Sequence, residues 1–368
     1  MDNPKYREIF RTLRNEILAG KYDNAQHLPS ENQLVRRFGA SRSTMIRVML
    51  ELQKYGLVER RRGSGTYLSP MARNSTGCLG LIIPGHRNVE IFAPICAEIA
   101  RVSREEGYTI LFGDASSSDP MERVRQAQAL AADYARRHVA GVFFEPIELC
   151  PDSRELSQEI LSILNESHIP VVLLDRDIVS AESRSGYDLV GIGNIRAGRT
   201  LADHLISQGA RDIRFFMPPH SAPTIFQRCE GVAASVSDAG LPWNREKICI
   251  ALPEDVERVR RLFRKGKSPD ALVCGNDRTA ARLLQTLGVL GKRVPDDVML
   301  CGFDDVACAR LLSPPLTSMR QPCEEIAAVA VRTLLERIRT PSLPIREICL
   351  EAKLVPRDST KCRASREL

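Results

Sequence analysis

Apolar residues at helical spacing predict a first helix over residues 4–19, because Gly20 follows where a helix would end. The apolar stripe of this helix is formed by Tyr6, Ile9, Phe10, Leu13 and Ile17. A polar loop over 21–29 comes next. Ser30 can then cap a second helix, with Gln33 in position to complete a capping box, and that helix is expected to end near Phe38 and Gly39.

A third helix is predicted to begin at Ser41, a favourable N-cap residue, directly after the tight turn at Gly39 and Ala40. Its buried face is expected to consist of Met45, Val48, Met49 and Leu52. Two short helices joined by a tight turn are typical of a helix-turn-helix, in which the second helix enters the major groove of DNA. We therefore expect Ser41, Arg42, Ser43 and Thr44 to face bases and phosphates, with Arg42 suited to a guanine contact.

Two short predicted strands, 57–60 and 66–68, flank the sequence RRGSG and indicate a β-hairpin wing. Glycines allow the backbone to turn sharply and to approach a partner closely. Arginines at the tip of such a hairpin suit a phosphate backbone or a narrow minor groove. The wing contacts that we expect come from Arg62, Gly63 and Gly65.

From Gly77 onward the pattern changes to short, fully apolar segments that alternate with amphipathic helices. The apolar segments are CLGLIIP, YTILFGD, GVFFEP, IPVVLLD, DIRFFMP, ALVCGND and VMLCGFDD. Fully apolar strands separated by helices predict parallel sheets that are covered on both faces. About 290 residues is too long for one such sheet, so two α/β lobes are expected.

Polar residues follow the ends of these strands. Because ligands of open α/β sheets bind beyond the carboxyl ends of the strands, these residues predict a cleft that binds a small molecule. The strand ends carry His86 and Arg87, Glu145, Asp175 and Arg176, Asn276, and Asp304. Such side chains can form paired hydrogen bonds to vicinal hydroxyl groups, which favours a sugar. Each Asp or Asn could instead simply cap the next helix.

Charge separates the two parts of the chain. Residues 1–70 hold 13 Lys and Arg against 7 Asp and Glu, so this segment carries the net charge of +6 that the whole chain has. This segregation favours an anionic polymer as the partner of the first segment. The eleven cysteines contain no C-x-x-C pair, no apolar run is long enough for a membrane span, and we expect no export signal and a cytoplasmic location.

The run LPSENQLVRRFGASRSTMIRVMLELQKYGLVERRRGSGTYL resembles the DNA-binding domain of the GntR family in its LPSE opening, its FG-x-SR-x-T turn and its G-x-GT wing. The resemblance covers about residues 5–68. It implies DNA contacts from Ser30, Asn32 and Arg47, in addition to those expected above. Ile46 stands where the family usually has Arg, and Ala25 stands at a usual Gly.

Residues 77–356 resemble the sensor domain of the LacI/GalR family in the motifs GIGNIRAGRTLADHLISQGARDI, R-x-x-G, DALVCGNDRTA, VPDDVMLCGFDD and LLSPPLTSMRQPCEEIA. The combination resembles the arabinose-repressor branch of the GntR family. It implies a homodimer, a carbohydrate effector and a chain that crosses three times between lobes, with the N-lobe at about 77–187 and 320–345. The effector contacts that it implies are Asp175, Arg228, Asn276, Asp304 and Gln321, with Arg176 beside them and the His86–Arg87 loop helping.

Three other functions agree less well with the sequence. Gly191 and Gly193 follow a strand and open a helix as a dinucleotide fingerprint would, but Arg196 stands at the third glycine position. A sugar-modifying enzyme could use Asp175 and Asp304 as acid and base, but the basic head has no role in that account. A transport-binding protein would need an export signal. We expect no enzyme activity, no cofactor and no metal site.

The sequence thus predicts an α/β protein with an N-terminal winged helix-turn-helix and a two-lobed, periplasmic-binding-protein-like sensor whose parallel sheets are flanked by helices. The expected segments are the head at 1–68, a linker at 69–76, the sensor at 77–356 and a tail at 357–368. The predicted function is that of a transcriptional repressor which binds pseudo-palindromic double-stranded operator DNA as a homodimer and is released by a sugar. The alternative is a carbohydrate-binding or carbohydrate-modifying protein whose head does not read DNA.

Overall fold

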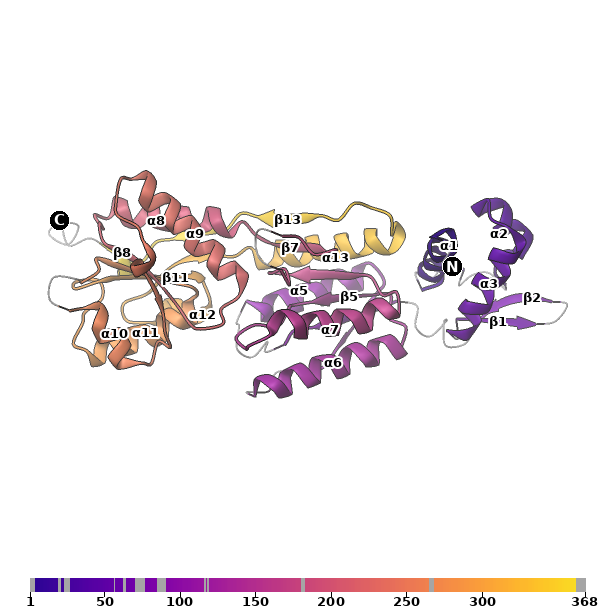
Figure 1. Ribbon diagram of the computed structural model, residues 1–368, viewed down its shortest axis with the longest axis horizontal. Coiled ribbons are helices and arrows are strands. Elements are labelled where there is room, and N and C mark those ends of the chain that lie inside the picture. Colours follow the sequence, from indigo (N-terminus) through magenta and orange to yellow (C-terminus); the bar gives the residue numbers. More distant parts are fainter. Residues whose placement is uncertain are drawn as a thin grey trace.

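The computed structural model describes residues 4–18, 21–22, 27–55, 57–61, 64–69, 77–84, 91–115, 117, 119–179, 183–264 and 268–361. Three bodies follow one another along its long axis, namely the head, the N-lobe and the C-lobe (Figure 1). The N-lobe lies between the other two.

The head contains three helices and a two-stranded hairpin: α1 (Pro4–Leu18), α2 (Glu31–Phe38), α3 (Arg42–Lys54), β1 (Val58–Arg61) and β2 (Gly65–Leu68). Ser30 caps α2 in a complete capping box with Gln33, and Gly39 ends this helix with a left-handed φ of 55°. Ser41 caps α3 by accepting from the backbone N–H of Thr44. β1 and β2 pair antiparallel, which confirms the predicted wing.

The core of the head forms between α1, α3 and the start of the hairpin. The buried side chains of α1 are Tyr6, Ile9, Phe10, Leu13 and Ile17, and those of α3 are Met45, Val48, Met49 and Leu52. These are the two apolar stripes predicted from helical spacing. Their burial leaves the N-terminal turn of α3 in solvent.

The N-lobe is built on a six-stranded, fully parallel sheet of order β13-β7-β6-β5-β3-β4. Its strands are β3 (Cys78–Ile82), β4 (Thr109–Phe112), β5 (Gly141–Phe144), β6 (Val171–Leu174), β7 (Asp188–Ile192) and β13 (Glu347–Leu350). α5 (Phe92–Glu105) and α13 (Cys323–Arg339) pack together on one face, and α6 (Pro120–Arg136) and α7 (Ser153–Glu166) pack together on the other.

The C-lobe repeats this plan with the order β14-β12-β11-β10-β8-β9, in which β14 alone runs antiparallel to its neighbour. Its strands are β8 (Ile213–Met217), β9 (Ile248–Ile250), β10 (Ala271–Cys274), β11 (Met299–Asp304), β12 (Thr317–Arg320) and β14 (Lys353–Val355). α8 (Asn194–Ser207) and α9 (Pro223–Asp238) cover one face, and α10 (Val256–Leu262), α11 (Asp277–Val289) and α12 (Ala307–Leu311) the other. Two short 3-10 helices are η2 (Arg245–Lys247) and η3 (Asp358–Thr360).

The chain passes between the lobes three times, after β7, after β12 and after β13. The number of crossings agrees with the prediction, but the expected boundaries of the N-lobe at 187 and 345 were wrong. β7 and β13 both pair within the N-lobe sheet, so this lobe extends through Ile192 and Leu350. The helical segment after the second crossing begins only at Cys323.

Two glycines allow α8 and α9 to pack backbone against backbone. A Cβ atom on Gly198 would lie 2.2 Å from the carbonyl oxygen of Arg228, and one on Gly231 would lie 2.0 Å from that of Ile195. Any larger residue would force the helices apart. This contact gives a physical reason for the glycine of the R-x-x-G motif, because it holds Arg228 beside the start of α8.

Residues 357–361, which the sequence analysis placed in the tail, pack on the C-lobe. Ser359 and Thr360 are buried, the hydroxyl of Ser359 donates to the carbonyl of Leu300, and the backbone N–H of Thr317 donates to the Ser359 hydroxyl. Throughout the described ranges, no helix is long and apolar enough to cross a membrane.

Candidate functional site

Arg176 follows β6 in the N-lobe and is surrounded by three carboxylates. Its side chain is 4% exposed and forms ion pairs with Glu145, with Glu148 (Nη1 to Oε2, 2.9 Å) and with Asp175 (Nη1 to Oδ2, 3.2 Å). Nε donates to the carbonyl oxygen of Pro146 at 3.2 Å. Each of the three guanidinium nitrogens therefore already has an acceptor within the chain.

Burial is the largest influence on the pKa values of Arg176, Glu145 and Glu148. It raises the pKa of Glu145 to about 8 and also raises the pKa of Glu148, while the charge of Arg176 acts in the opposite direction. Burial on its own would lower the pKa of Arg176, but the surrounding carboxylates, Glu148 first, hold it above its usual value. The N-lobe thus presents a buried cluster that is rich in carboxylates.

Arg228, in α9, organises the facing cluster of the C-lobe. Its Nε donates to Oδ1 of Asn194 at 2.9 Å, and its Nη1 donates to the carbonyl oxygen of Gly275 at 2.8 Å. Nη1 also lies 3.5 Å from Oδ1 of Asp304, which accepts from Nε2 of Gln321 at 2.7 Å. The guanidinium additionally stacks over the ring of Phe303, 4.7 Å from its centroid.

The backbone is unusual where the two clusters meet the strand ends. Asp175 has a φ of 66° and Asp304 a φ of 105°, in a region that residues with a side chain rarely occupy. Gly191 makes room for the first of these turns, because a Cβ there would lie 2.9 Å from the carbonyl oxygen of Asp175. Such backbone strain is typical of binding sites, where the surrounding structure compensates for it.

The two clusters lie on opposite sides of one inter-lobe space. Burial raises the pKa of Asp304, and the negative charge of Asp175 in the other lobe raises it further. Asp304 in turn raises the pKa of Glu148. The lobes also touch directly, since the backbone N–H of Leu149 donates to the carbonyl oxygen of His220 at 3.1 Å.

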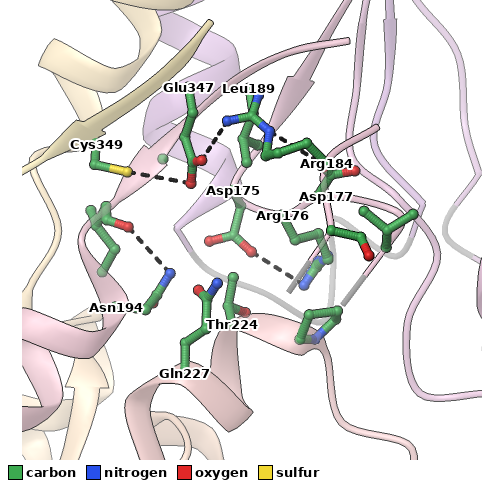
Figure 2. Close-up of a pocket in the computed structure, with 15 residues that line it drawn as sticks. Asp175, Arg176, Asp177, Arg184, Leu189, Asn194, Thr224, Gln227, Glu347 and Cys349 are labelled. Carbon is green, nitrogen blue, oxygen red and sulfur yellow. Dashed lines mark hydrogen bonds and ion pairs between the residues drawn. The ribbon is translucent and has the colours of Figure 1, made fainter. Parts of the chain in front are cut away.

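A pocket opens between the lobes next to these clusters, with about 470 Å³ of empty volume, part of it open to solvent. Asp175 and Arg176 line it from the N-lobe, while Asn194, Thr224 and Gln227 line it from the C-lobe. Figure 2 shows the Asp175 carboxylate and the Gln227 amide directed into the same space from the two sides. Convergent polar groups of this kind are typical of a site for a small, hydroxyl-rich ligand.

Five of the predicted effector residues are gathered by the fold, namely Asp175, Arg176, Arg228, Asp304 and Gln321. For Asn276 the structure supplies a structural role, because its Oδ1 caps α11 by accepting from the backbone N–H of Thr279 at 2.9 Å. A ligand contact from Asn276 stays a prediction. His86 and Arg87 lie outside the described residues.

The sequence analysis did not single out Glu148, Asn194, Thr224 or Gln227. Glu148 stands four residues beyond the end of β5, so the rule that looks at strand ends stopped just short of it. The other three lie at the N-terminal ends of α8 and α9, where the chain enters the C-lobe or turns back from β8. The available signals were the short sequence distance of Thr224 and Gln227 from Arg228 and the place of Asn194 within the motif GIGNIRAG.

In the head, the predicted DNA-contact residues of α3 lie on an accessible surface. Arg42 is the first residue of the helix and is exposed, as are Ser41 and Ser43. Arg47 is also exposed, and its guanidinium lies 4.5 Å from the ring centroid of Tyr6. Ile46, at the position where the family usually has Arg, is 40% exposed on the same helix.

The hairpin presents further polar groups. Arg61 stacks over the ring of Tyr67, with its guanidinium carbon 4.6 Å from the centroid. Gly65 has a φ of 112°, a conformation that requires glycine at the turn. Arg62 and Gly63, which were expected at the wing tip, lie outside the described residues.

The glycine motif at 191–196 does not form a dinucleotide site. A dinucleotide fingerprint joins a strand and a helix of one βαβ unit. Here β7 belongs to the N-lobe sheet, while α8, which begins at Asn194, covers the C-lobe sheet. Gly193 therefore lies in a connection between lobes, and the side chain of its neighbour Asn194 accepts a hydrogen bond from Arg228.

Two separate parts of the chain match known protein families. Residues 5–68 match the family described as bacterial regulatory proteins, gntR family. Residues 202–360 match the periplasmic binding protein-like domain. The chain joins a GntR-family DNA-binding head to a periplasmic-binding-protein-like domain.

Relatives with known roles are similar to this two-part chain. The "Arabinose metabolism transcriptional repressor" of Geobacillus stearothermophilus is 26% identical over 97% of this chain and 98% of its own length. The "Ribose operon repressor" of Halalkalibacterium halodurans is 27% identical over 78% of this chain and 80% of its own length. The first alignment spans both the GntR-family head and the periplasmic-binding-protein-like domain.

Solved structures share the fold. A transcriptional regulator CelR in complex with cellobiose aligns with a TM-score of 0.66 at 23% identity, covering 87% of this chain and 91% of its own. A LacI family transcriptional regulator from Enterococcus faecium with bound ribose aligns with a TM-score of 0.61 at 22% identity, covering 77% of this chain and 98% of its own. At these identities the likeness concerns the fold of the periplasmic-binding-protein-like domain.

Proposed function

We propose that this protein is a sequence-specific, DNA-binding transcriptional repressor whose release from its operator is controlled by a sugar bound between the two lobes. The observation that carries this proposal is the union, in one chain, of an accessible helix-turn-helix and wing with a buried polar cluster shared by two lobes. A carbohydrate-modifying enzyme or a transport protein would have no use for the head. The protein would act in the cytoplasm, without enzyme activity and without a cofactor.

On the DNA side, Ser41, Arg42, Ser43 and Thr44 would approach bases and phosphates in the major groove. Arg42 is suited to a bidentate contact with guanine, and the exposed side chain of Ile46 is suited to the methyl group of thymine. The remaining contacts that we propose come from Ser30, Asn32, Arg47, Arg62, Gly63 and Gly65.

On the effector side, Asp175 and Arg176 would hold the sugar from the N-lobe, and Arg228, Asp304 and Gln321 from the C-lobe. A ligand that bonds both clusters favours the closed arrangement of the lobes over an open one. The names of the relatives, which concern arabinose metabolism and the ribose operon, support a sugar. His86, Arg87 and Asn276 are the further contacts that we propose.

The protein would act as a homodimer on a pseudo-palindromic operator, because two identical heads read two half-sites only at the matching spacing. Lobe closure would change that spacing. By thermodynamic reciprocity, DNA must alter effector affinity by the same factor as the effector alters DNA affinity.

This function is tested by selecting operator sequences. The full-length protein is the bait and a random library of DNA duplexes is the source. We expect a two-fold symmetric sequence to be enriched, and we expect a sugar that raises the melting temperature of the protein to release that sequence. Enrichment of no sequence would refute DNA reading. A sugar that is turned over rather than merely bound would favour the enzyme alternative.

A further inference from the structure

The inter-lobe clusters contain more carboxylates than cations. Among the described residues, the four carboxylates of Glu145, Glu148, Asp175 and Asp304 form ion pairs with two cations, Arg176 and Arg228. We infer that the effector is a sugar rich in hydrogen-bond donors that carries no anionic group, so that neutral and amine-bearing sugars bind whereas sugar phosphates and sugar acids are rejected. This inference rests on the proposed sensor function and narrows its ligand to one charge class.

The first argument is that the arginines which would hold an anion are already engaged. A free arginine fork is a frequent means by which protein sites bind phosphates and carboxylates. In Arg176 every guanidinium nitrogen donates to an acceptor of the chain, three of which belong to carboxylates. In Arg228, Nε is held by Asn194, and Nη1 by Gly275 and Asp304, so that Nη2 is the guanidinium nitrogen to which the described residues supply no bond. An anionic ligand would have to break the bonds of Arg176 without a replacement to form a two-bonded contact with it.

A second arginine, Arg184, lines the pocket together with Arg176. Arg184 forms an ion pair with Glu347 and lies 3.8 Å (Nε to Oδ2) from Asp177, and both of these acidic residues line the pocket themselves. Figure 2 shows Arg184 directed toward Glu347. Among the described residues that line the pocket, both arginines are therefore paired with carboxylates.

The second argument is that the pocket contains an acceptor atom that lacks a donor. Oδ1 of Asp175 is buried and has no hydrogen-bond partner among the described residues. An unsatisfied buried acceptor is unfavourable, so a ligand that supplies a donor gains more than one that supplies another acceptor. Hydroxyl and ammonium groups supply donors, whereas a phosphate or carboxylate supplies acceptors only. Asp175 lines the pocket itself.

The third argument is electrostatic. Burial raises the pKa of Glu145, Glu148 and Asp304, and like charges across the cleft raise those of Glu148 and Asp304 further. A negative charge on the ligand would be repelled by those carboxylates that are ionised, because buried charges are poorly screened. A positive charge on the ligand would instead stabilise the ionised carboxylates.

Matched sugars that differ in one substituent test the charge class. The full-length protein is titrated by calorimetry with D-glucose, D-glucosamine, D-glucose 6-phosphate and D-glucuronate, and with D-ribose and D-ribose 5-phosphate. We expect a neutral or amine-bearing sugar to bind. The affinity for each phosphate or acid should be at least about 100-fold lower than that for its parent sugar, a difference of about 2.7 kcal/mol in binding free energy. A phosphate or acid that binds more tightly than its parent sugar would overturn the inference.

A variant tests the mechanism of the discrimination. Glu148→Gln removes one acceptor charge from Arg176, so the gap between parent sugar and anionic derivative should shrink roughly tenfold, and Glu155→Gln, an exposed substitution on α7, should leave it unchanged. An unchanged gap in Glu148→Gln would contradict the role of the carboxylate surplus. If none of these probes binds, a wider carbohydrate screen by thermal shift identifies the effector. An anionic effector would overturn this inference and leave the proposed sugar sensor intact. A protein that binds its operator but no carbohydrate of any charge would refute the proposed sugar sensor.

Discussion

The rings of Phe10 in the head and His168 in the N-lobe lie edge to face, with their centroids 5.3 Å apart. Nη1 of the fully buried Arg14 donates to the carbonyl oxygen of the same histidine at 2.9 Å. A second pair, Tyr55 and His138, brings the end of α3 to within 6.2 Å (ring centroids) of the loop after α6. The head thus docks on the loops that end α6 and α7, which gives lobe movement a direct route to the DNA-binding surface.

This docking is expected to weaken in acid. Burial lowers the pKa of His138 and of His168, and the charge of Arg14 lowers both further. The docked form therefore binds fewer protons than a form in which both imidazoles titrate near their ordinary value of about 6.5, so the contribution of the contact is present above that pH and is lost below it. Small-angle scattering of the full-length protein should show a larger maximum dimension at pH 5.5 than at pH 7.5.

The double variant His138→Gln/His168→Gln is the control for this prediction. Glutamine cannot gain a proton, so the dimension of the variant should be the same at both pH values. A wild-type dimension that does not change with pH, or a variant that responds as the wild type does, would contradict a histidine-dependent contact.

Arg42→Ala should abolish site-specific DNA binding and leave the fold intact, because the residue is exposed at the first turn of α3. Loss of one bidentate contact with guanine costs about 1–3 kcal/mol of discrimination, roughly a factor of 10 to 100. A gel-shift titration against the selected operator measures it. Arg154→Ala, an exposed substitution on α7 of the N-lobe, should bind as the wild type does, and an unaltered operator affinity of Arg42→Ala would exclude the proposed base contact.

Arg228→Ala should still bind operator but no longer respond to the effector, because Arg228 joins Asn194 and Asp304 at the cleft. Hydrogen bonds to charged groups contribute about 1.5–3 kcal/mol, so effector affinity should fall roughly 10- to 100-fold. Calorimetry and effector-dependent release from DNA measure the two parts. The control is Arg199→Ala on α8, which removes the half-exposed ion-pair partner of Asp238. This variant should keep the full effector-dependent release from DNA. A response retained in Arg228→Ala would remove this residue from the site.

Gly198→Ala should destabilise the C-lobe, because the added Cβ would lie 2.2 Å from the carbonyl oxygen of Arg228. Overpacking of this kind costs about 1–3 kcal/mol or more. Gly288→Ala in α11 is the matched control, since no atom lies within 4 Å of its added Cβ, and there alanine should stabilise the helix by about 0.5–1 kcal/mol. Urea denaturation measures both changes, and a neutral Gly198→Ala would contradict the close packing of α8 and α9.

Much of the head could be predicted because its signals are local. The capping box of Ser30 and Gln33, the left-handed Gly39 and the N-cap at Ser41 each act over three or four residues. Hydrophobic spacing then places the three helices without knowledge of distant contacts.

The cleft was predicted less completely because distant segments build it. Asp175 and Asp304 stand directly after or at the end of a buried strand and were found by that rule. Glu148 and Gln227 belong to the site through the way in which the lobes meet, which no local pattern encodes. Asn276 illustrates a limit of the same rule, since a polar residue after a strand can also serve as a helix cap, as Asn276 does for α11.

The three passages between the lobes have a consequence for synthesis of the chain. The N-lobe acquires α13 and its edge strand β13 only from residues 323–350, after the strands of the C-lobe from β8 to β12 have been made. Domains generally fold as units while the ribosome proceeds from the N-terminus, so the head can fold early, whereas the N-lobe stays incomplete until residue 350 has emerged. A product of translation that stops before this point would therefore contain a folded head but an incomplete N-lobe, which gives the cell a reason to degrade such fragments quickly.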